Sequence, residues 1–163
     1  MENETLEKTN WFIIAHSFNA DGGAASQTIT DRVPYFLQRG LQLVVLSSFT
    51  GTKDDRFPHY QVMAPSPSGV RYEMRFVIKN NIKNNVMRGI FKAVSTIVCL
   101  PFYLLEKIFL QLDSQWSWFI SATIKGCFII RKHRPELIYS TAGPPTTHLA
   151  GYILNRIYHI PWM

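Results

Sequence analysis

The chain has 163 residues, of which 47% are hydrophobic, and a formal charge of +6 at neutral pH. This length is typical of one domain, and the composition excludes a disordered chain. Two cysteines without Cys-x-x-Cys or Cys/His spacing exclude a disulfide framework and predict no metal site. The positive charge favours anionic partners, which are phosphates, nucleic acid or an acidic membrane surface.

The first third of the chain is predicted to form a β-loop-α-β unit. The apolar residues 11–15 have the length of a strand and lack polar alternation, which is typical of a strand buried on both faces. Residues 24–38 have helical spacing, with Pro34 as a kink or an early end, and residues 41–49 form a second buried strand. Two such strands joined by a helix imply a parallel pair with a right-handed crossover.

The middle of the chain combines strand and helix signals. Residues 60–64 are a candidate third strand, and residues 65–69 form a turn-rich break. From residue 70 onward the pattern fits a strand or a helix, because alternation of apolar residues coincides with basic residues at every fourth position. Residues 86–112 are predicted to be helical, with Pro101 as a kink.

The last third returns to alternating helices and strands. We expect a helix at residues 116–131, a short strand at 136–141, a helix at 146–159 and the opening of a further strand at 160–163. This alternation predicts an α/β fold with a Rossmann-like, doubly wound and mainly parallel sheet. Because the chain stops inside a strand, we expect the sheet to be incomplete at its C-terminus and the chain to be a fragment.

The predicted organisation is therefore simple. Residues 1–9 are expected to be a flexible tail, and residues 10–163 to form one partial Rossmann-like domain. Within this domain, residues 86–131 form a helical segment that is both apolar and basic.

The loop after the first predicted strand is a candidate ligand-binding site. It contains Asp21, Gly22 and Gly23, and glycines at such a position allow the backbone to approach a phosphate or a sugar closely. The loop matches neither GxGxxG nor GxxxxGK[ST], so a dehydrogenase-type dinucleotide site is poorly supported and a P-loop is excluded. A plain strand-to-helix turn is the alternative interpretation.

A second loop, within residues 140–151, also follows a strand and opens a helix. Carboxyl ends of parallel strands share one edge of a sheet, so both loops are expected to line one crevice. Thr146 or Thr147 is the expected helix cap, and His148 lies in the first turn, where a histidine is more often packed or exposed than bound to ligand. The donor- or acceptor-binding candidates of this loop are Gly143, Pro144, Thr146 and His148.

The apolar and basic middle segment is a candidate membrane contact. Basic and aromatic residues beside an apolar helix are what an interfacial membrane helix needs, whereas the alternative is a solvated face beside an ordinary core helix. No uninterrupted apolar run reaches the ~20 residues that span a bilayer, which favours peripheral contact. The residues expected to contact the membrane are Arg88, Lys92, Phe102 and Lys107.

Catalytic patterns are otherwise sparse. The sequence contains no GxSxG, no HExxH and no pair of carboxylates at a defined spacing, so no catalytic residue is assigned. A nucleic-acid partner is not expected, because the sequence contains no recognisable reader helix or aromatic sheet motif.

Several motifs occur in a familiar order. An apolar strand, the two-glycine loop, a helix ending in LQRG and the strand LQLVVLSS are followed by DSQWSW and RPELIYSTAGPPTTHLAGYILNRIYHIPW. In this order they resemble the N-terminal, acceptor-side domain of family-four glycosyltransferases of the GT-B type. The resemblance covers most of the chain, with Leu41 where many members have histidine.

The resemblance implies a retaining glycosyltransferase of the hexosyltransferase type. Such an enzyme moves a sugar from a nucleotide-sugar donor to a cell-envelope saccharide or lipid-linked acceptor, and it needs no other cofactor. Gly22 and Gly23 would approach the donor phosphates or the transferred sugar, while the Pro-Pro loop and His148 would line the crevice. The family's C-terminal, donor-binding domain is missing, so the fragment alone is expected to be inactive.

The expected location is cytoplasmic, with peripheral contact to the inner face of the cell membrane. A second hypothesis is a non-catalytic α/β module that docks on an anionic membrane or on a partner chain.

Overall fold

The computed structural model describes residues 9–20, 24–141 and 143–163 and has an α/β fold. Its four-stranded sheet is parallel throughout, in the order β3–β2–β1–β4. This order and direction confirm the predicted Rossmann-like, mainly parallel sheet. The strands are β1 Asn10–Ile14, β2 Gln42–Ser47, β3 His59–Gln61 and β4 Leu137–Ser140. The helices are α1 Ala24–Thr30, α2 Val33–Gln38, α3 Pro67–Asn81, α4 Asn85–Leu105 with the π-helical turn Glu106–Leu110, α5 Trp118–His133 and α6 Pro145–Tyr158.

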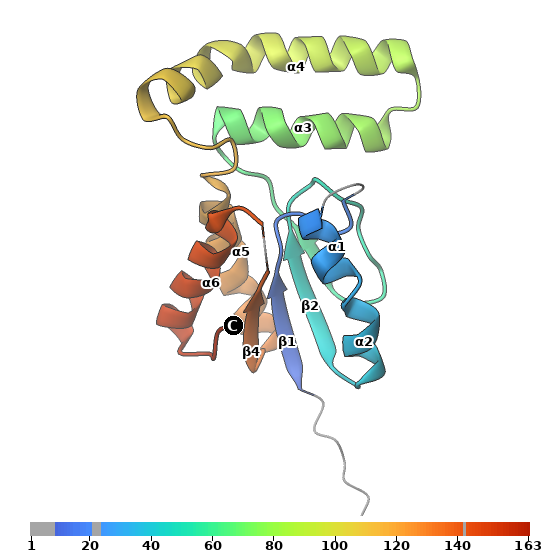
Figure 1. Cartoon of the computed structure of the whole chain (residues 1–163), viewed down its shortest axis with the longest axis vertical. Helices are drawn as coiled ribbons and strands as arrows, with labels where there is room; N and C mark the ends of the chain where they lie inside the picture. Colours follow the sequence, from blue (N-terminus) through green and yellow to red (C-terminus); the bar gives the residue numbers. More distant parts are fainter. Residues whose placement is uncertain (1–8, 21–23, 142) are drawn as a thin grey trace, which may run out of the picture.

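Helices cover both faces of the sheet, as Figure 1 shows. Helices α5 and α6 pack on one face, where Trp118 and Leu154 meet Phe12 of β1 in one buried cluster. Helices α1 and α2 pack on the other face, where Ile29 meets Ile13 of β1 in a second cluster. Neighbouring residues of β1 therefore point into two different cores, which explains why the strand sequence shows no polar alternation.

The segment expected to form one helix at residues 24–38 forms two. Helix α1 ends at Thr30, and α2 starts at Val33 with Pro34 in its first turn. Proline lacks a backbone N–H and is tolerated at a helix start, where that N–H has no partner in the helix. The kink or early end that was expected at Pro34 is instead a break between two short helices, and Pro34 lies in the first turn of the second one.

The segment with ambiguous signals is helical. Helix α3 begins inside the expected turn-rich break, because the Ser66 hydroxyl caps it by accepting a hydrogen bond from Gly69 N at 3.2 Å. The repeat of basic residues at every fourth position was therefore the helical signal. The predicted strand at residues 60–64 is shorter and ends at Gln61.

Helices α3 and α4 form an antiparallel hairpin beyond the carboxyl ends of the strands (Figure 1). Asn84 caps α4 by accepting hydrogen bonds from Val86 N and Met87 N. The Arg88 guanidinium donates to the Ile82 carbonyl at 3.0 and 3.2 Å, which fixes the connection between the helices. The helix predicted at residues 86–112 is confirmed through Pro101 to Leu105, and the π-helical turn Glu106–Leu110 follows it.

The chain returns to the sheet edge at its last residues. Trp162 forms a parallel bridge with Ile138 of β4, and Ser140 N donates to the Met163 carbonyl at 2.9 Å. The predicted strand opening at residues 160–163 therefore extends the sheet beyond β4.

Candidate functional site

Polar side chains gather where the carboxyl ends of β1, β2 and β4 meet. His16 follows β1, and Ser48 and Thr50 follow β2. Ser140 is the last residue of β4, and Thr141 follows it. All five are buried. Buried polar residues at this edge are characteristic of a ligand site in an open parallel sheet, so this edge is the candidate functional site.

His16 lies at the centre of this edge and is fully buried. Its Nδ1 is 3.3 Å from the Ser17 hydroxyl, and its ring lies edge-on to Trp118 with 5.1 Å between centroids. The Nε2 atom is buried and has no hydrogen-bond partner. Burial lowers the pKa of His16 to about 4, so the ring is neutral at physiological pH.

Glu73 reaches the same edge from helix α3. Its Oε1 accepts a hydrogen bond from Ala64 N at 3.0 Å, and its Oε2 accepts one from Phe49 N at 3.4 Å. The same Oε1 lies 3.9 Å from His16 Nε2, beyond hydrogen-bond distance. Burial raises the pKa of Glu73 to about 7, and the two backbone hydrogen bonds oppose that shift.

The pair of His16 and Glu73 has a defined chemical capacity. A carboxyl group with a pKa near neutrality can give or take a proton at physiological pH, while the imidazole beside it stays neutral. Both side chains are closed to solvent in this structure. Glu73 also joins helix α3 to the segments that follow β2 and β3, so the hairpin is tied to the site through one carboxylate.

The loop after β4 lies against His16. A Cβ atom added at Gly143 would lie 3.5 Å from Thr147 Oγ1 and 4.0 Å from His16 Cβ. The loops that follow β1 and β4 therefore line the same edge of the sheet. Pro144 is half-buried at the N-cap position of α6.

The expected cap of α6 is absent from the structure. The N-cap position is Pro144, and no side chain caps the helix. The hydroxyl oxygens of Thr146 and Thr147 are instead buried without hydrogen-bond partners. The capping prediction was wrong because Pro145 occupies the first helical position, which moves both threonines inside the helix.

His148 is exposed on the first turns of α6. Its Nδ1 lies 2.8 Å from the Ser140 hydroxyl, which also accepts a hydrogen bond from Trp162 Nε1 at 2.8 Å. The Ser140 hydroxyl thus connects α6, β4 and the C-terminal segment at the rim of the candidate site.

Asp21, Gly22 and Gly23 lie outside the described residues, as do residues 1–8 of the expected tail. A polar pocket of about 360 Å³ opens between the described residues that follow β1 and helix α1. Its wall is fixed by two side chains of α1, since Ser26 Oγ accepts from Ala20 N at 2.8 Å and Thr30 Oγ1 accepts from Asn19 N at 3.2 Å. The lining residues are Asn19, Ala20, Ser26, Gln27, Thr30, Asp31 and Thr52.

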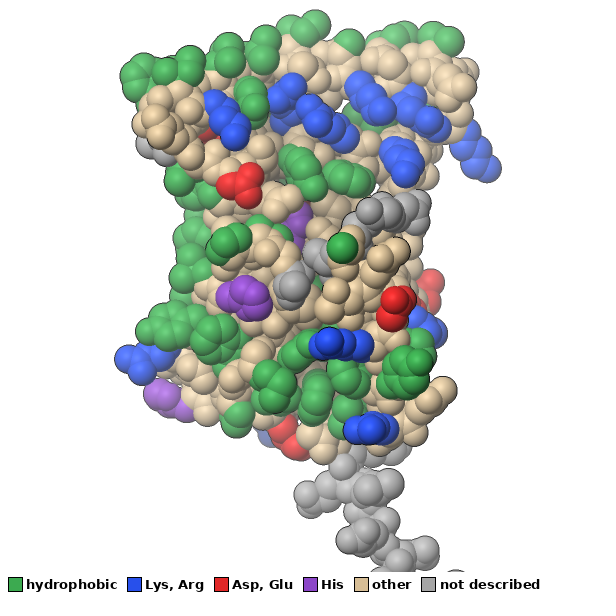
Figure 2. Space-filling view, in the orientation of Figure 1, with side chains coloured by type: hydrophobic (Ala, Val, Ile, Leu, Met, Phe, Trp, Pro, Cys, Tyr) green, Lys and Arg blue, Asp and Glu red, His purple; other side chains and the backbone are tan. Residues whose placement is uncertain are grey.

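Helix α4 presents its apolar side outward. Residues that face α3 include Arg88, Thr96 and Tyr103, which are half-buried, whereas Ile97 is 69% exposed and Phe102 is 56% exposed. Figure 2 shows the result as a hydrophobic rim along the hairpin above a row of Lys and Arg side chains. Of the residues expected to contact a membrane, Lys92, Phe102 and Lys107 are exposed, and Arg88 is half-buried by its bonds to Ile82.

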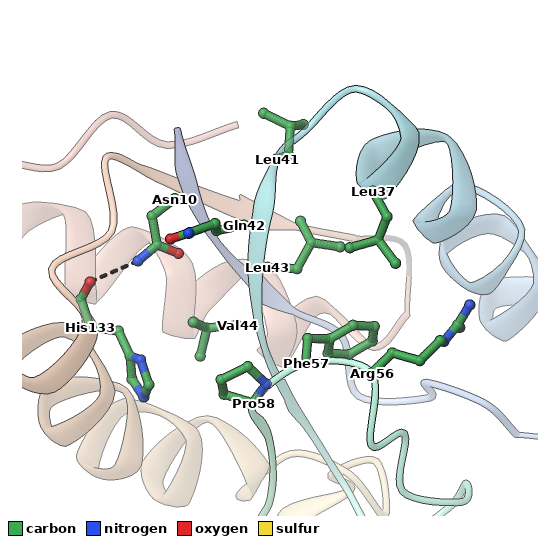
Figure 3. A pocket seen from close by; sticks show the side chains of 10 residues that line it. All are labelled: Asn10, Leu37, Leu41, Gln42, Leu43, Val44, Arg56, Phe57, Pro58 and His133. Carbon is green, nitrogen blue, oxygen red and sulfur yellow. Dashed lines mark hydrogen bonds between the residues drawn. The ribbon is translucent and has the colours of Figure 1, made fainter. Parts of the chain in front are cut away.

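An apolar pocket lies at the amino-terminal end of the strands, opposite the candidate site (Figure 3). It has a volume of about 360 Å³ and opens beside the amino-terminal halves of β1 and β2. Ligands of open parallel sheets bind at the carboxyl ends of strands, so we do not assign this pocket to the candidate site. It is lined by Asn10, Leu37, Leu41, Gln42, Leu43, Val44, Arg56, Phe57, Pro58 and His133.

Sequence reasoning missed His16 and Glu73. His16 stands directly after the first apolar strand, at a position where a polar residue reaches the carboxyl edge, and this signal was available. Glu73 lies in a segment of basic residues and resembles a solvated charge in the sequence. Only the packing of α3 over the edge brings it to His16.

Metal binding has no support from side-chain clusters in the described part of the chain, where no group of three or more His, Cys, Asp or Glu residues could hold an ion. No protein-family model, curated protein or solved structure matches the chain. The function therefore has to be inferred from the geometry of the site and from the sequence motifs.

Proposed function

We propose that this chain is the acceptor-side half of a retaining glycosyltransferase that works on the surface of an anionic membrane. It would take part in transferring a sugar from a nucleotide-sugar donor to a cell-envelope saccharide or a lipid-linked acceptor. The observation that carries the proposal is the outward-facing apolar side of α4, placed beside the carboxyl edge of a parallel sheet. The order of the motifs from the first strand to the final Ile-Pro-Trp segment supports the assignment to this class of enzyme.

The membrane part of the proposal rests on the orientation of α4. A helix of a globular protein buries its apolar stripe and exposes its polar one. Helix α4 does the reverse, since none of its residues is buried and its polar side faces α3. A contiguous apolar surface of this kind marks a site of interaction with a protein or a membrane. The exposed apolar side chains include Val86, Ile90, Phe91, Val94, Ile97, Val98, Phe102, Leu105, Ile108 and Phe109.

The positive charge of the hairpin favours an anionic membrane as the partner of the exposed apolar side of α4. The hairpin, residues 67–105, has a single acidic residue, Glu73, and that residue is buried. An apolar face bordered by unbalanced positive charge is what binds an interfacial helix to anionic lipid. The basic residues of the hairpin are Arg71, Arg75, Lys79, Lys83, Arg88 and Lys92.

The hairpin is suited to lie on the membrane. Among the described residues, Asn85–Phe109 is long and apolar enough to cross a bilayer by length and composition alone. Helix α3, however, packs along α4 and carries Arg71, Arg75 and Lys79. A crossing α4 would take these charges into the hydrocarbon, which is costly, whereas an in-plane α4 leaves them among the lipid head groups.

The sheet edge supplies the sugar-binding part of the proposal. A hydroxyl-rich acceptor needs buried donors and acceptors that fix its orientation, and the edge offers the Nε2 atom of His16 and the hydroxyl groups of Thr146 and Thr147 without partners. The glycine loop at residues 21–23 is proposed to approach the donor phosphates, as the family resemblance implies. The described residues form one sheet, so we do not propose catalysis by this chain without a donor-binding domain.

The membrane part is tested with vesicles. We expect the chain to float with anionic vesicles and Ile97→Glu to reduce binding by tenfold or more, because a side chain that is 69% exposed would no longer insert. Tyr35→Glu is the matched control, since Tyr35 is 66% exposed on α2 and lies away from the hairpin. Equal binding by all three proteins, or no binding by any of them, would contradict the proposal.

The transferase part is tested in cells that make the saccharide. In the proposed enzyme, Gly23→Trp should abolish saccharide synthesis while leaving the amount of protein and its membrane fraction unchanged. Full synthesis by that variant would count against a donor-binding role for the loop.

A non-catalytic module that docks on an anionic membrane or a partner chain is the second candidate function. The exposed apolar face of α4 supports this candidate as well as the first one, because docking through that face requires no active site. The effect of Gly23→Trp distinguishes the two candidates. A docking module would tolerate Gly23→Trp, but it would lose its docking with Ile97→Glu.

A further inference from the structure

A small polar pocket lies between helices α3 and α4, and the ring of Tyr72, which lines it, lies 6.3 Å from that of His16. Its volume is about 90 Å³. Every residue that lines it is an arginine or carries a hydroxyl group, so the pocket is rich in hydrogen-bond donors and positive charge. The lining residues are Ser68, Arg71, Tyr72, Arg75, Tyr103 and Ser114.

Arg71 is held in place but keeps donors free. Its Cζ atom lies 4.4 Å from the centroid of the Tyr103 ring, so α4 fixes the guanidinium of α3 by a cation–π contact. Its Nε atom is buried and has no hydrogen-bond partner. A fixed guanidinium plane with unused N–H groups matches the oxygen atoms of a phosphate, which arginine binds in pairs.

Neither arginine of the pocket forms an ion pair with a carboxylate in the described part of the chain, where the ion pairs are formed by side chains other than Arg71 and Arg75. Two carboxylates come from the segment after α4, where Glu106 accepts from Ser68 N at 3.1 Å and Asp113 accepts from Ser114 N at 2.6 Å. Both are bound to backbone N–H groups, and neither lines the pocket.

We propose that this pocket binds the phosphate group of an anionic membrane lipid. Its volume of about 90 Å³ has room for a phosphate group. Tyr103 lines the pocket while its neighbour Phe102 is 56% exposed on the apolar face of α4. One turn of α4 would thus contact the acyl chains and the phosphate of the same lipid layer.

The choice of a lipid as the source of the phosphate rests on the proposed membrane docking, whereas the phosphate preference rests on the pocket alone. The test compares phosphatidylcholine vesicles that contain phosphatidic acid with vesicles that contain oleic acid at a matched surface potential. We expect the wild-type chain to bind the phosphatidate vesicles about tenfold more tightly, because a charge-assisted hydrogen-bond pair adds to the general attraction.

Variants separate the pocket from general charge. Arg75→Gln and Arg71→Lys should each remove the preference for phosphatidate. Arg71→Lys should do so although it keeps the positive charge, because lysine lacks the paired N–H groups of arginine. Lys83→Gln is the matched control, because Lys83 is an exposed charge of the same hairpin outside the pocket and should weaken binding to both kinds of vesicle equally. Urea denaturation of each variant verifies that it is folded. Equal binding of wild type to both vesicles, or equal effects of Arg75→Gln and Lys83→Gln, would overturn the proposal.

Soluble phosphate tests the source. Glycerol 3-phosphate in solution should compete with phosphatidate vesicles only weakly, since it lacks the apolar contact with α4. If it binds tightly to the wild type and not to Arg75→Gln while no vesicle binds, the lipid assignment is overturned and the membrane docking fails with it, and the phosphate site remains. If vesicles bind without any phosphate preference, the membrane docking stands and the phosphate site is overturned.

Discussion

Glu73 Oε1 lies 3.9 Å from His16 Nε2 in the buried edge of the sheet, with no hydrogen bond between them. Burial acts on the two groups in opposite directions, raising the pKa of Glu73 to about 7 and lowering that of His16 to about 4. Each group is thereby driven toward its neutral form. The pair is thus uncharged in slightly acidic solution, and only Glu73 ionises near neutral pH.

The first prediction concerns the charge of Glu73. Its pKa is near 7 in the folded chain and 4.5 in the unfolded chain, so the folded state binds the proton more tightly between these values. The free energy of unfolding therefore falls as pH rises from 4.5 to 7, by on the order of 3 kcal/mol at most, and stays low above pH 7. Glu73→Gln cannot ionise and should remove this loss.

Urea denaturation of wild type and Glu73→Gln at pH 5 and pH 8 measures the effect. Glutamine matches only one of the two acceptors that the backbone N–H groups need, which adds a cost that does not change with pH. The diagnostic quantity is the difference in free energy of unfolding between the variant and wild type. From pH 5 to pH 8 this difference should shift in favour of the variant. A difference that does not change with pH would show that Glu73 has an ordinary pKa.

His16 should have the opposite pH dependence. Its pKa is about 4 when folded and 6.5 when unfolded, so the unfolded state binds the proton more tightly between these values. The contribution of His16 to stability is present above pH 6.5 and is lost as pH falls through 4. His16→Gln should therefore lower the free energy of unfolding, relative to wild type, by less at pH 4.5 than at pH 7.

The double variant His16→Gln/Glu73→Gln separates these two contributions. The two groups lie close together, so their effects need not be additive, and the double-mutant cycle gives their interaction energy. Thermal or urea denaturation over pH 4–8 provides the four curves. If His16→Gln moves the stability curve in the same direction as Glu73→Gln, the assignment of opposite pKa shifts is wrong.

Two glycines with different surroundings give the next prediction. A Cβ at Gly51 would lie 1.9 Å from the carbonyl oxygen of Phe18 and 2.6 Å from that of Asn19, which are backbone atoms that cannot move aside easily. Gly51→Ala should therefore cost about 1–3 kcal/mol, as overpacking does. Gly89 lies within α4 with nothing within 4 Å, so Gly89→Ala should stabilise the chain by ~0.5–1 kcal/mol.

The midpoint of urea denaturation compares these variants under one condition. Because the two changes add the same methyl group, a common effect of side-chain size would move both midpoints in the same direction. Movement in opposite directions supports the close approach of Gly51 to the backbone that follows β1.

The strands could be predicted from the sequence because their signal is local. Ile13 and Phe12 point into different cores, so the apolar run itself identifies a strand covered on both sides. The start of α3 was harder, because the residues that begin it, Ser66, Pro67 and Gly69, are also common in turns. The hydroxyl cap of Ser66 decides for a helix, and that contact exists only in the folded chain.

The candidate site could be predicted only in part. The edge where β1 and β4 end follows from the strand order, and Gly143 does lie against His16. Glu73 could not be assigned to this edge, because no local pattern relates the first turns of α3 to the end of β1. The outward direction of the apolar side of α4 was also beyond the sequence, since it depends on which side packs against α3.

The last prediction concerns the hydroxyl of Thr147. The residue is fully buried, and its Oγ1 atom has no hydrogen-bond partner. A buried hydroxyl without a partner carries a desolvation cost of about 1–3 kcal/mol, which valine avoids with the same shape. Thr147→Val should therefore raise the free energy of unfolding by ~1 kcal/mol. Thr147→Ser is the matched control, because it keeps the hydroxyl and removes only a methyl group, and it should be destabilising.

Stability and function are expected to separate at this position. If Thr147 Oγ1 serves a ligand at the sheet edge, the proposed transferase with Thr147→Val should lose saccharide synthesis although its fold is more stable, while Thr147→Ser should retain synthesis. A valine variant that is less stable than wild type would show that the hydroxyl has a partner in the folded chain. A more stable valine variant with full synthesis would remove Thr147 from the ligand site and leave His16 and Thr146 as the unpartnered groups there.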